Sequence, residues 1–406
     1  MKVLIVTGDS PYPPTTGSDL RTFNLLRQVS RQHEVSLLSL YTPFSEEEDG
    51  AVFLKTLCSR VELIAKRKRA KREHVLRLLK GTWQGEPIRN VFIYFEEMAN
   101  RIGVLTEAEH FDIIQFHHSY MGPYVKAISP LNRSGTILFM HNVAYMQFRR
   151  MMFVARGWRS KRKFFLNWLF LKRATLKYMR LFDKCIVVSE LDRDILKRDA
   201  PDLDVVALPG GVDIEEYPFL PEQSTTPTLI LVGKMSYTPN VDGAIFFCNE
   251  VLPLIKQQVP DARLLIVGRD PTRSIQALAS EDVVVTGYVE SVIPYYQQSL
   301  ASVVPLRAGG GTRLKIPESM ALGRPVVSTT LGCEGLDVNH GENILIADTP
   351  VDFAAQTVRL LKDDQLRQRI VANGRHLVET KYDWQVVGSH LLQIYDQVAG
   401  QVIRRG

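Results

Sequence analysis

The chain has 406 residues, of which 45% are hydrophobic and 23% charged; this balance is ordinary for a folded protein and excludes a wholly disordered chain. The length exceeds what one hydrophobic core usually holds, so two domains are predicted. The net charge of +6 is uneven, because residues 1–205 carry 33 Lys and Arg against 22 Asp and Glu, about +11, and the remainder is about −5.

The N-terminus predicts a short strand, because the apolar run at Val3–Val6 passes directly into Gly8 and Asp9. That run is too short for the apolar region of a signal peptide, and no stretch reaches the roughly 18 apolar residues that span a bilayer. The four cysteines are too widely spaced for a zinc ribbon, and a disulfide framework is not expected. We therefore expect a cytoplasmic protein.

Short apolar runs alternate with helical patterns along the whole chain, and the runs are apolar on both alternating positions, which is typical of parallel strands covered on both faces. Strand and helix alternating in this way predict an α/β fold with doubly wound sheets. The predicted strands are Lys2–Thr7, Val35–Leu40, Val61–Ala65, Ile113–Phe116, Thr136–Met140, Lys184–Val188, Thr228–Val232, Arg263–Val267, Val283–Thr286, Ser302–Pro305, Pro325–Ser328 and Ile344–Ala347. The helical segments include Ser18–Arg31, Ala244–Gln258 and Val351–Lys362.

The strand–glycine turn–helix pattern begins twice, once at the N-terminus and again at Thr228, after a stretch rich in proline and glycine. We predict a Rossmann-like domain over residues 1–206, a second over 207–381, and a closing helix within 382–406 that returns to the first domain. We expect a cleft between the carboxyl ends of the two sheets. Ligands of such sheets bind at the carboxyl ends of the strands, so the cleft is the predicted ligand site.

Residues at the ends of the first-domain strands are candidates for the ligand side of this cleft. Gly17 and Ser18 open the first helix, whose N–H groups favour an anion, although N-capping by Ser18 explains the same residues. His141 follows a strand and would face the cleft, although a structural hydrogen-bonding role is the alternative. His117 and His118 also follow a strand, and at most one of two adjacent residues would face the cleft.

Two basic regions dominate the first half, one at residues 66–72 and the other at Arg149–Arg180, where cations mix with Trp and Phe. The second region suits an anionic membrane surface. A solvated helix pair that packs its Leu and Phe side chains inward explains the region equally well. Binding to nucleic acid is a weaker alternative, because no nucleic-acid module is recognisable and the aromatics cluster with aliphatic residues.

The strand at Thr228–Val232 is followed by Gly233, which would clear space, and by Lys234, whose point charge suits a diphosphate. A solvated loop lysine is the alternative interpretation.

A glycine loop follows the strand at Ser302–Pro305 and would bring backbone N–H groups close to a ligand. Thr312 can start the next helix, whose N-terminus favours anions. The loop glycines are Gly309, Gly310 and Gly311.

Charged residues follow that loop directly. Arg313 and Lys315 add positive charge, and Glu318, on the first turns of the helix, could accept paired hydroxyls of a ribose. Together with the glycines they predict a phosphate-and-ribose site, whereas a glycine loop alone would indicate only a flexible surface segment.

These segments resemble the GT-B fold glycosyltransferases of family 4, the group 1 glycosyltransferases. The resemblance covers nearly the whole chain, is strong in residues 205–400 and is weak in residues 45–110 and 145–180. The motifs that carry it are Gly233–Asn240, Gly309–Thr329, Pro209–Asp213 and Tyr382–Trp384.

The resemblance implies a role for each candidate residue. Lys234 takes the position of the cation at the donor diphosphate, Lys315 that of a second phosphate-side cation, and Glu318 that of the carboxylate on the donor ribose. Gly17 resembles the first of two glycines near the diphosphate, and His141 the N-domain histidine beside the sugar.

The resemblance also places the donor base against Gly287, Tyr288 and Val289, whose backbone groups would read its edge. This chain departs from the family pattern at the first of the paired glutamates, which is replaced by Gly310, and at the second N-terminal glycine, which is replaced by Ser18. The departures bear on the identity of the sugar more than on the fold.

The activity implied is that of a retaining glycosyltransferase, which moves a sugar from a UDP- or GDP-sugar to a glycan or lipid-linked acceptor in cell-surface polysaccharide or glycoconjugate synthesis. We expect a same-face displacement, with Lys234, Lys315 and Arg313 stabilising the departing diphosphate. We expect no separate cofactor and no essential metal, and a cytoplasmic location that includes the inner face of the membrane. Another GT-B enzyme, such as an epimerase or a phosphorylase, and a non-catalytic sugar-nucleotide sensor remain the alternatives.

Overall fold

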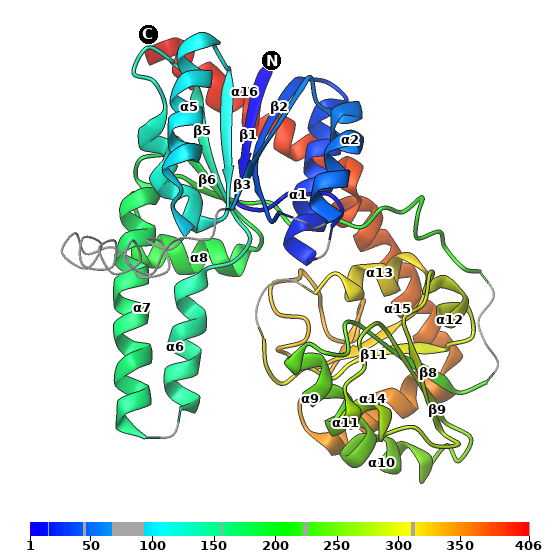
Figure 1. Cartoon of the computed structure of the whole chain (residues 1–406). Helices are drawn as coiled ribbons and strands as arrows, with labels where there is room; N and C mark the ends of the chain where they lie inside the picture. The colour runs from blue at the N-terminus through cyan, green and yellow to red at the C-terminus, as the bar shows by residue number, and fades with distance from the viewer. Residues whose placement is uncertain are drawn as a thin grey trace. The chain divides into compact units, whose positions relative to one another are not determined.

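The computed structural model describes residues 1–14, 16–43, 46–66, 93–155, 157–221, 226–309 and 313–405 (Figure 1). Most of the basic run predicted at residues 66–72 lies outside these residues, as do Gly310, Gly311 and Thr312 of the predicted glycine loop.

The chain forms two compact units. Unit 1 comprises Met1–Leu208 together with Gly388–Gly406, and unit 2 comprises Pro209–Val387. The observed divisions therefore lie two and six residues beyond the predicted ones at 206 and 381. The second division falls inside one continuous helix, α16 (Trp384–Arg405), so the last segment of the chain is shared by both units.

Unit 1 contains a seven-stranded parallel sheet in the order β3-β2-β1-β4-β5-β6-β7. Its strands are β1 (Lys2–Thr7), β2 (Glu34–Tyr41), β3 (Arg60–Ala65), β4 (Ile113–His117), β5 (Gly135–Met140), β6 (Lys184–Val187) and β7 (Val205–Ala207). The six strands predicted here are confirmed to within one residue at each end, and β7 was not predicted. The strand order reverses between β1 and β4, which is where doubly wound sheets bind ligands.

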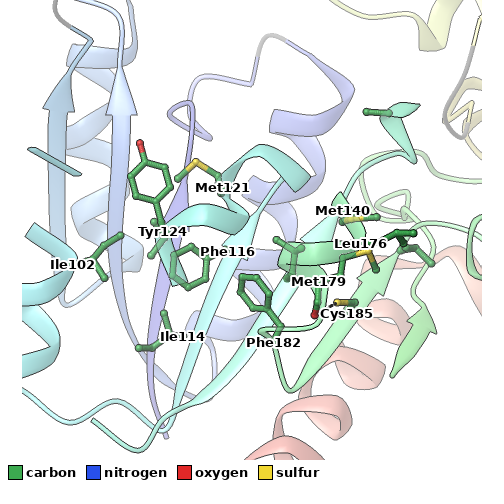
Figure 2. Close-up of a cluster of buried hydrophobic side chains, with 14 of the residues drawn as sticks. Ile102, Ile114, Phe116, Met121, Tyr124, Met140, Leu176, Met179, Phe182 and Cys185 are labelled. Carbon is green, nitrogen blue, oxygen red and sulfur yellow. Dashed lines mark hydrogen bonds between the residues drawn. The ribbon is translucent and has the colours of Figure 1, made fainter. Parts of the chain in front are cut away.

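Helices cover the sheet of unit 1, and the space between is filled with apolar side chains such as Phe116 and Phe182, whose rings meet edge to face at 5.6 Å (Figure 2). The helices are α1 (Gly17–Ser30), α2 (Glu46–Leu57), α5 (Glu96–Ala108), α6 (Ala144–Val154), α7 (Trp158–Met179), α8 (Glu190–Asp199) and the 3-10 segment η1 (Ser119–Ala127). None of the helices in the described part of the chain combines the length and the apolar character needed to cross a membrane.

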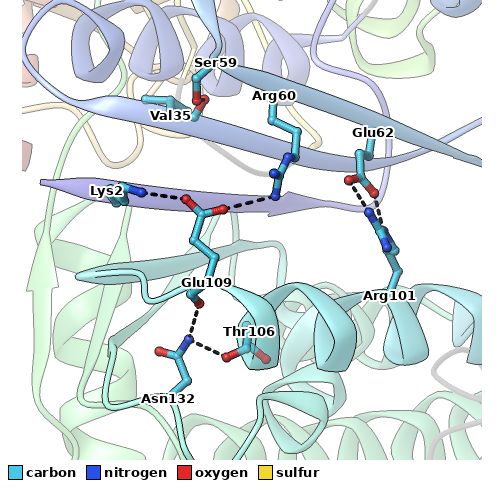
Figure 3. A network of polar contacts seen from close by, with 9 residues as sticks. All are labelled: Lys2, Val35, Ser59, Arg60, Glu62, Arg101, Thr106, Glu109 and Asn132. Atoms are coloured by element: carbon cyan, nitrogen blue, oxygen red, sulfur yellow. Dashed lines mark hydrogen bonds and ion pairs between the residues drawn. The ribbon is translucent and has the colours of Figure 1, made fainter.

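A polar network ties α5 to the amino ends of the strands (Figure 3). Glu109 accepts from Lys2 at 2.8 Å and from Arg60 at 3.1 Å, and Arg101 of α5 pairs with Glu62 of β3. These ion pairs are partly exposed, so each contributes little to stability. They lie at the amino ends of the strands, and the candidate functional residues lie at the opposite, carboxyl ends.

Unit 2 contains a six-stranded parallel sheet in the order β10-β9-β8-β11-β12-β13. Its strands are β8 (Thr228–Val232), β9 (Arg263–Val267), β10 (Val283–Gly287), β11 (Ala301–Val304), β12 (Val326–Ser328) and β13 (Leu345–Ile346), and all six predictions are confirmed to within one residue at each end. The helices are α9 (Thr238–Phe246), the π-helical η2 (Phe247–Val251), α10 (Leu252–Lys256), α11 (Arg273–Gln276), α12 (Ile293–Gln297), α13 (Lys315–Ala321), α14 (Pro350–Lys362), α15 (Asp364–Leu377) and the π-helical η3 (Val378–Tyr382).

One predicted helix start is wrong. The helix predicted to begin at Ala244 begins at Thr238, because Pro239 occupies its first turn, where a missing N–H costs little. The helix predicted over Ser18–Arg31 is confirmed to within one residue at each end, but its N-cap is Thr16 and not Ser18. The Thr16 hydroxyl accepts from the Asp19 N–H at 3.3 Å, and the Asp19 carboxylate accepts from the Thr16 N–H at 2.9 Å.

Candidate functional site

In unit 2, the loops that follow β8 and β11 lie side by side at the carboxyl ends of these strands, because the two strands are parallel neighbours. The β8 loop carries Gly233 and Lys234 into α9, and the β11 loop leads to α13. Gly309, at the described end of the β11 loop, has a φ of 108°, which favours glycine. A Cβ at Gly309 would lie 3.2 Å from the Arg313 guanidinium and 3.3 Å from the Pro239 ring, so the loop after β11 packs closely against the start of α9.

A buried asparagine joins the two loops. Asn240 accepts a hydrogen bond from Lys315 Nζ at 2.9 Å and donates its amide N–H to the Lys234 carbonyl, also at 2.9 Å. A Cβ on Gly233 would lie 2.6 Å from the Asn240 amide nitrogen and 2.9 Å from Lys315 Nζ, so only glycine leaves room for this arrangement. Asn240 thereby fixes the direction of the Lys315 ammonium, a role that the sequence pattern did not reveal.

Lys234 lies at the carboxyl end of β8 and is more exposed to solvent than Lys315. Its side chain is 52% exposed, and its Nζ is 3.6 Å from the carboxylate of Asp270, in the loop after β9. An ion pair this exposed contributes little to stability. The ammonium is therefore available to an anion that approaches the strand ends.

Lys315 and Glu318 lie three residues apart in α13 and so share one face of the helix. Burial lowers the pKa of Lys315 to about 8, against the opposing charge of Glu318 and with help from Arg313. Burial raises the pKa of Glu318 to about 7, with Lys315 opposing and Glu216 adding to the shift. The site therefore holds an ammonium and a carboxyl group that are both poorly hydrated. A ligand would replace the missing hydration if its phosphate accepted from Lys315 and its hydroxyl groups donated to Glu318.

The raised pKa of Glu318 predicts a pH-dependent cost to folding. Between its ordinary pKa of 4.5 and about 7, the unfolded chain releases this proton and the folded protein retains it, so the free energy of unfolding falls as pH rises. We expect Glu318→Gln to match the wild type at pH 4 and to be the more stable protein at pH 8. Urea unfolding of both proteins at the two pH values measures this difference, and equal curves at pH 8 would contradict it.

In unit 1, the carboxyl ends of β4 and β5 carry a buried polar chain. The Tyr395 hydroxyl of α16 donates to the side-chain Oε1 of Gln115 at 2.9 Å, and the side-chain Nε2 of Gln115 lies 2.7 Å from His117 Nε2. His117 Nδ1 lies 3.3 Å from His141 Nε2, and the Thr22 hydroxyl of α1 is within 3.4 Å of both rings. This polar chain connects residues of three elements, α16, β4 and α1, to His141.

The surroundings of His141 favour its neutral form. Burial holds its pKa well below 6.5, with the charges of the neighbouring histidines and Arg21 adding to the shift, and burial lowers the pKa of His117 to about 3. His141 Nδ1 is buried and has no hydrogen-bond partner within the ranges that the structure describes. His118 lies outside the strand, with a φ of 76° and its ring stacked on Tyr120 at 4.9 Å.

The remaining predicted residues lie at other strand and helix ends. Gly17 and Ser18 form the first turn of α1, and the space around a Gly17 Cβ is open. Tyr288 and Val289 follow β10, which is separated from β8 by β9. Val289 packs into an apolar cluster and Tyr288 is 75% exposed, so in this loop the Tyr288 ring is the accessible side chain.

The Asp-x-Asp pattern occurs twice in the sequence, at Asp192–Asp194 and Asp202–Asp204. Asp192 accepts from Ser189 at the N-cap of α8, and Asp202 pairs with Arg180. Over the described ranges, no group of three or more His, Cys, Asp or Glu side chains is arranged to hold a metal ion.

Two protein families match this chain in succession. Residues 16–216 match the family described as Glycosyltransferase Family 4, and residues 226–363 match the family described as Glycosyl transferases group 1. The first match lies in unit 1 except for its last residues, and the second lies in unit 2 and includes Lys234, Lys315 and Glu318.

Curated relatives are distant. The chain is 23% identical to an uncharacterized 44.6 kDa protein in the cps region of Klebsiella pneumoniae, over 97% of this chain and 99% of that protein. It is 29% identical to a phosphatidyl-myo-inositol mannosyltransferase of Mycobacterium leprae, over 53% of this chain and 59% of that protein.

Solved structures share the whole fold. Sucrose-phosphate synthase from Thermosynechococcus elongatus superposes with a TM-score of 0.69 at 17% identity, covering 99% of this chain and all of the other. Anabaena HepE, solved in complex with UDP, superposes with a TM-score of 0.68 at 14% identity, covering 98% of this chain and all of the other.

Proposed function

Because the chain belongs to the GT-B fold glycosyltransferases of group 1, family 4, we propose that it transfers a sugar from a nucleoside diphosphate-sugar to a glycan or lipid-linked acceptor with retention of anomeric configuration. The observation that carries the proposal is the pairing of Lys315 and Glu318 on one face of α13, beside Lys234 and Asn240. A pyrophosphate needs cations, and a ribose needs an acceptor for its hydroxyl hydrogens.

In this proposal, Lys315 and Lys234 bind the donor diphosphate. The negative charge on the departing diphosphate grows as the glycosidic bond breaks, so cations held in place beforehand stabilise the transition state more than the ground state. Glu318 accepts from the ribose hydroxyls and thereby fixes the position of the nucleotide. The backbone after β10, at Tyr288 and Val289, would read the edge of the base.

Retention is proposed to proceed by displacement on a single face of the sugar. The acceptor oxygen forms its bond to the anomeric carbon as the diphosphate leaves, and the acceptor proton passes to a diphosphate oxygen. This route needs no carboxylate nucleophile, whereas double displacement needs two carboxyl groups about 5 Å apart. We assign His141, as a neutral hydrogen-bonding group, to the sugar and acceptor side of the reaction.

The relatives favour a role in the synthesis of surface polysaccharides or glycolipids. The Klebsiella protein is encoded in a cps region, and the Mycobacterium relatives are named as transferring mannose to phosphatidyl-myo-inositol. The mannosyltransferase alignments cover only about 60% of those proteins, so the acceptor proposed here is a class, a glycan or a lipid-linked glycan.

A panel of nucleoside diphosphates tests the proposed donor. A ligand present at 100 times its dissociation constant should stabilise the folded protein by about 2.7 kcal/mol, which is seen as a rise in Tm. We expect UDP or GDP to produce this rise, and ADP and inorganic pyrophosphate to produce less. Stabilisation by none of them would overturn the proposal, and stabilisation without hydrolysis or transfer of any sugar-nucleotide would identify a non-catalytic binding protein.

A further inference from the structure

Two helices of unit 1 form a hairpin that extends away from the sheet. Helices α6 and α7 pack side by side along their length (Figure 1). At the base of the hairpin, Asp199 of α8 accepts from Tyr145 at 2.7 Å and from Lys172 at 2.5 Å, and Trp168 packs against the core of unit 1. The base is therefore anchored by hydrogen bonds and apolar contacts.

The tip of the hairpin, which we define as Met151–Val154 and Trp158–Phe165, exposes aromatic side chains. Phe153 is 71% exposed and Trp158 is 66% exposed, on the two sides of the connection between the helices. Phe165 is exposed about two turns further along α7. Removing large aromatic side chains from water is energetically favourable. Their shared exposure at one end of an anchored hairpin therefore indicates a surface that a membrane or another molecule covers.

The charge of the hairpin has one sign. Helix α6 carries two Lys or Arg and α7 carries seven, and neither contains an Asp or Glu. No acidic residue occurs anywhere between Asp112 and Asp183. Within the described ranges, no carboxylate pairs with Arg159, Lys161, Arg162 or Lys163, whereas Lys172 at the base has its partner in Asp199. The tip is thus complementary to an anionic surface.

Cations and apolar groups share one hollow at this tip. A hollow of about 450 Å³ is lined by Met152 and Phe153 of α6 and by Lys161, Arg162 and Phe165 of α7. A ligand that joins a phosphate to a hydrocarbon chain would contact the cations through its phosphate and the apolar side chains through its hydrocarbon.

We propose that the tip of the α6–α7 hairpin docks the protein on an anionic lipid bilayer, with Phe153 and Trp158 entering the interface and Lys161 and Arg162 meeting lipid phosphates. An amphipathic surface of aromatics and cations is suited to the headgroup region. Nucleic acid offers the same phosphate charge but leaves Phe153, Met152 and Phe165 without an apolar partner, so the bilayer is the better match. This inference does not depend on the transfer reaction.

Co-flotation of the full chain with vesicles tests the proposal. We expect binding to phosphatidylglycerol vesicles to exceed binding to phosphatidylcholine vesicles by about tenfold or more, and to weaken as salt is raised. Trp158 should show a blue-shifted emission on binding, which Trp158→Phe removes. Equal binding to the two lipids, or binding to random-sequence DNA as tight as to phosphatidylglycerol, would overturn the proposal.

Matched variants locate the surface. The double variant Lys161→Gln with Arg162→Gln should lower vesicle binding about tenfold, and Lys362→Gln with Arg369→Gln, which removes two exposed cations from unit 2, should not. Phe153→Ser should likewise weaken binding, and Leu131→Ser, at an 81% exposed position elsewhere in unit 1, should not. Equal losses in the tip variants and their controls would contradict the assignment.

Nucleotide binding separates this proposal from the proposed function. The stabilisation by nucleoside diphosphate should be unchanged in the tip variants, because Lys234, Lys315 and Glu318 lie in unit 2 and the tip variants change none of the residues assigned to the donor. A protein that binds nucleotide and ignores anionic vesicles overturns the membrane proposal alone. A protein that binds the vesicles and ignores every nucleotide overturns the transferase proposal alone.

Discussion

Replacing Glu318 with Ala is expected to lower kcat/KM for sugar transfer by about 100-fold or more and to leave the protein folded. The carboxylate is assigned to the ribose hydroxyls, and without it the nucleotide loses both a charge-assisted hydrogen bond and its fixed orientation. The folded state should not suffer, because burial raises the pKa of this group and its charged form is a cost to folding. Initial rates with varied donor, together with a thermal unfolding curve, measure both effects.

Two companion variants sharpen the Glu318 experiment. Glu318→Gln keeps the size and one oxygen of the side chain, so its loss should be smaller than that of Glu318→Ala. Glu281→Ala removes an exposed glutamate from the same unit and should leave transfer unchanged. Transfer at the wild-type rate by Glu318→Ala would remove the ribose assignment.

Lys234→Ala is expected to reduce kcat by a similar order, about 100-fold, with a smaller change in Tm. Its ammonium faces solvent beside Asp270, and so exposed an ion pair contributes at most about 1 kcal/mol to folding. The loss should therefore appear in catalysis and in affinity for the nucleoside diphosphate. Stopped assays with saturating donor give kcat, and titration with the nucleoside diphosphate gives Kd.

The control for Lys234 is Lys362→Ala, which removes another exposed lysine of unit 2. Comparing Lys234→Ala with Lys315→Met separates the contributions of the two lysines to transfer. The two lysines differ in setting, because burial lowers the pKa of Lys315 and its ammonium donates a hydrogen bond to Asn240. If Lys315→Met abolishes transfer and Lys234→Ala does not, the diphosphate lies on Lys315 alone and the role assigned to Lys234 is wrong.

The sequence located the strands well and one helix start poorly. Parallel strands covered on both faces are continuous apolar runs, and such a run is visible without knowing its neighbours. The strand β7 was missed because it has only three residues and lies at the edge of its sheet, half-buried for most of its length. The start of α9 was missed because Pro239, read alone, indicates a loop as readily as the first turn of a helix.

The sequence by itself determined that this chain builds two parallel α/β sheets and that Gly233, Lys234, Lys315 and Glu318 follow strands of the second one, because strand runs and the residues after them are local patterns. Only the tertiary structure decided that Asn240 bridges Lys234 and Lys315, that Lys315 and Glu318 share a poorly hydrated environment, and that Tyr395 connects through Gln115 to the histidines, 280 residues away. Desolvation and hydrogen bonding depend on which groups pack together from distant parts of the chain, and no local pattern contains that information.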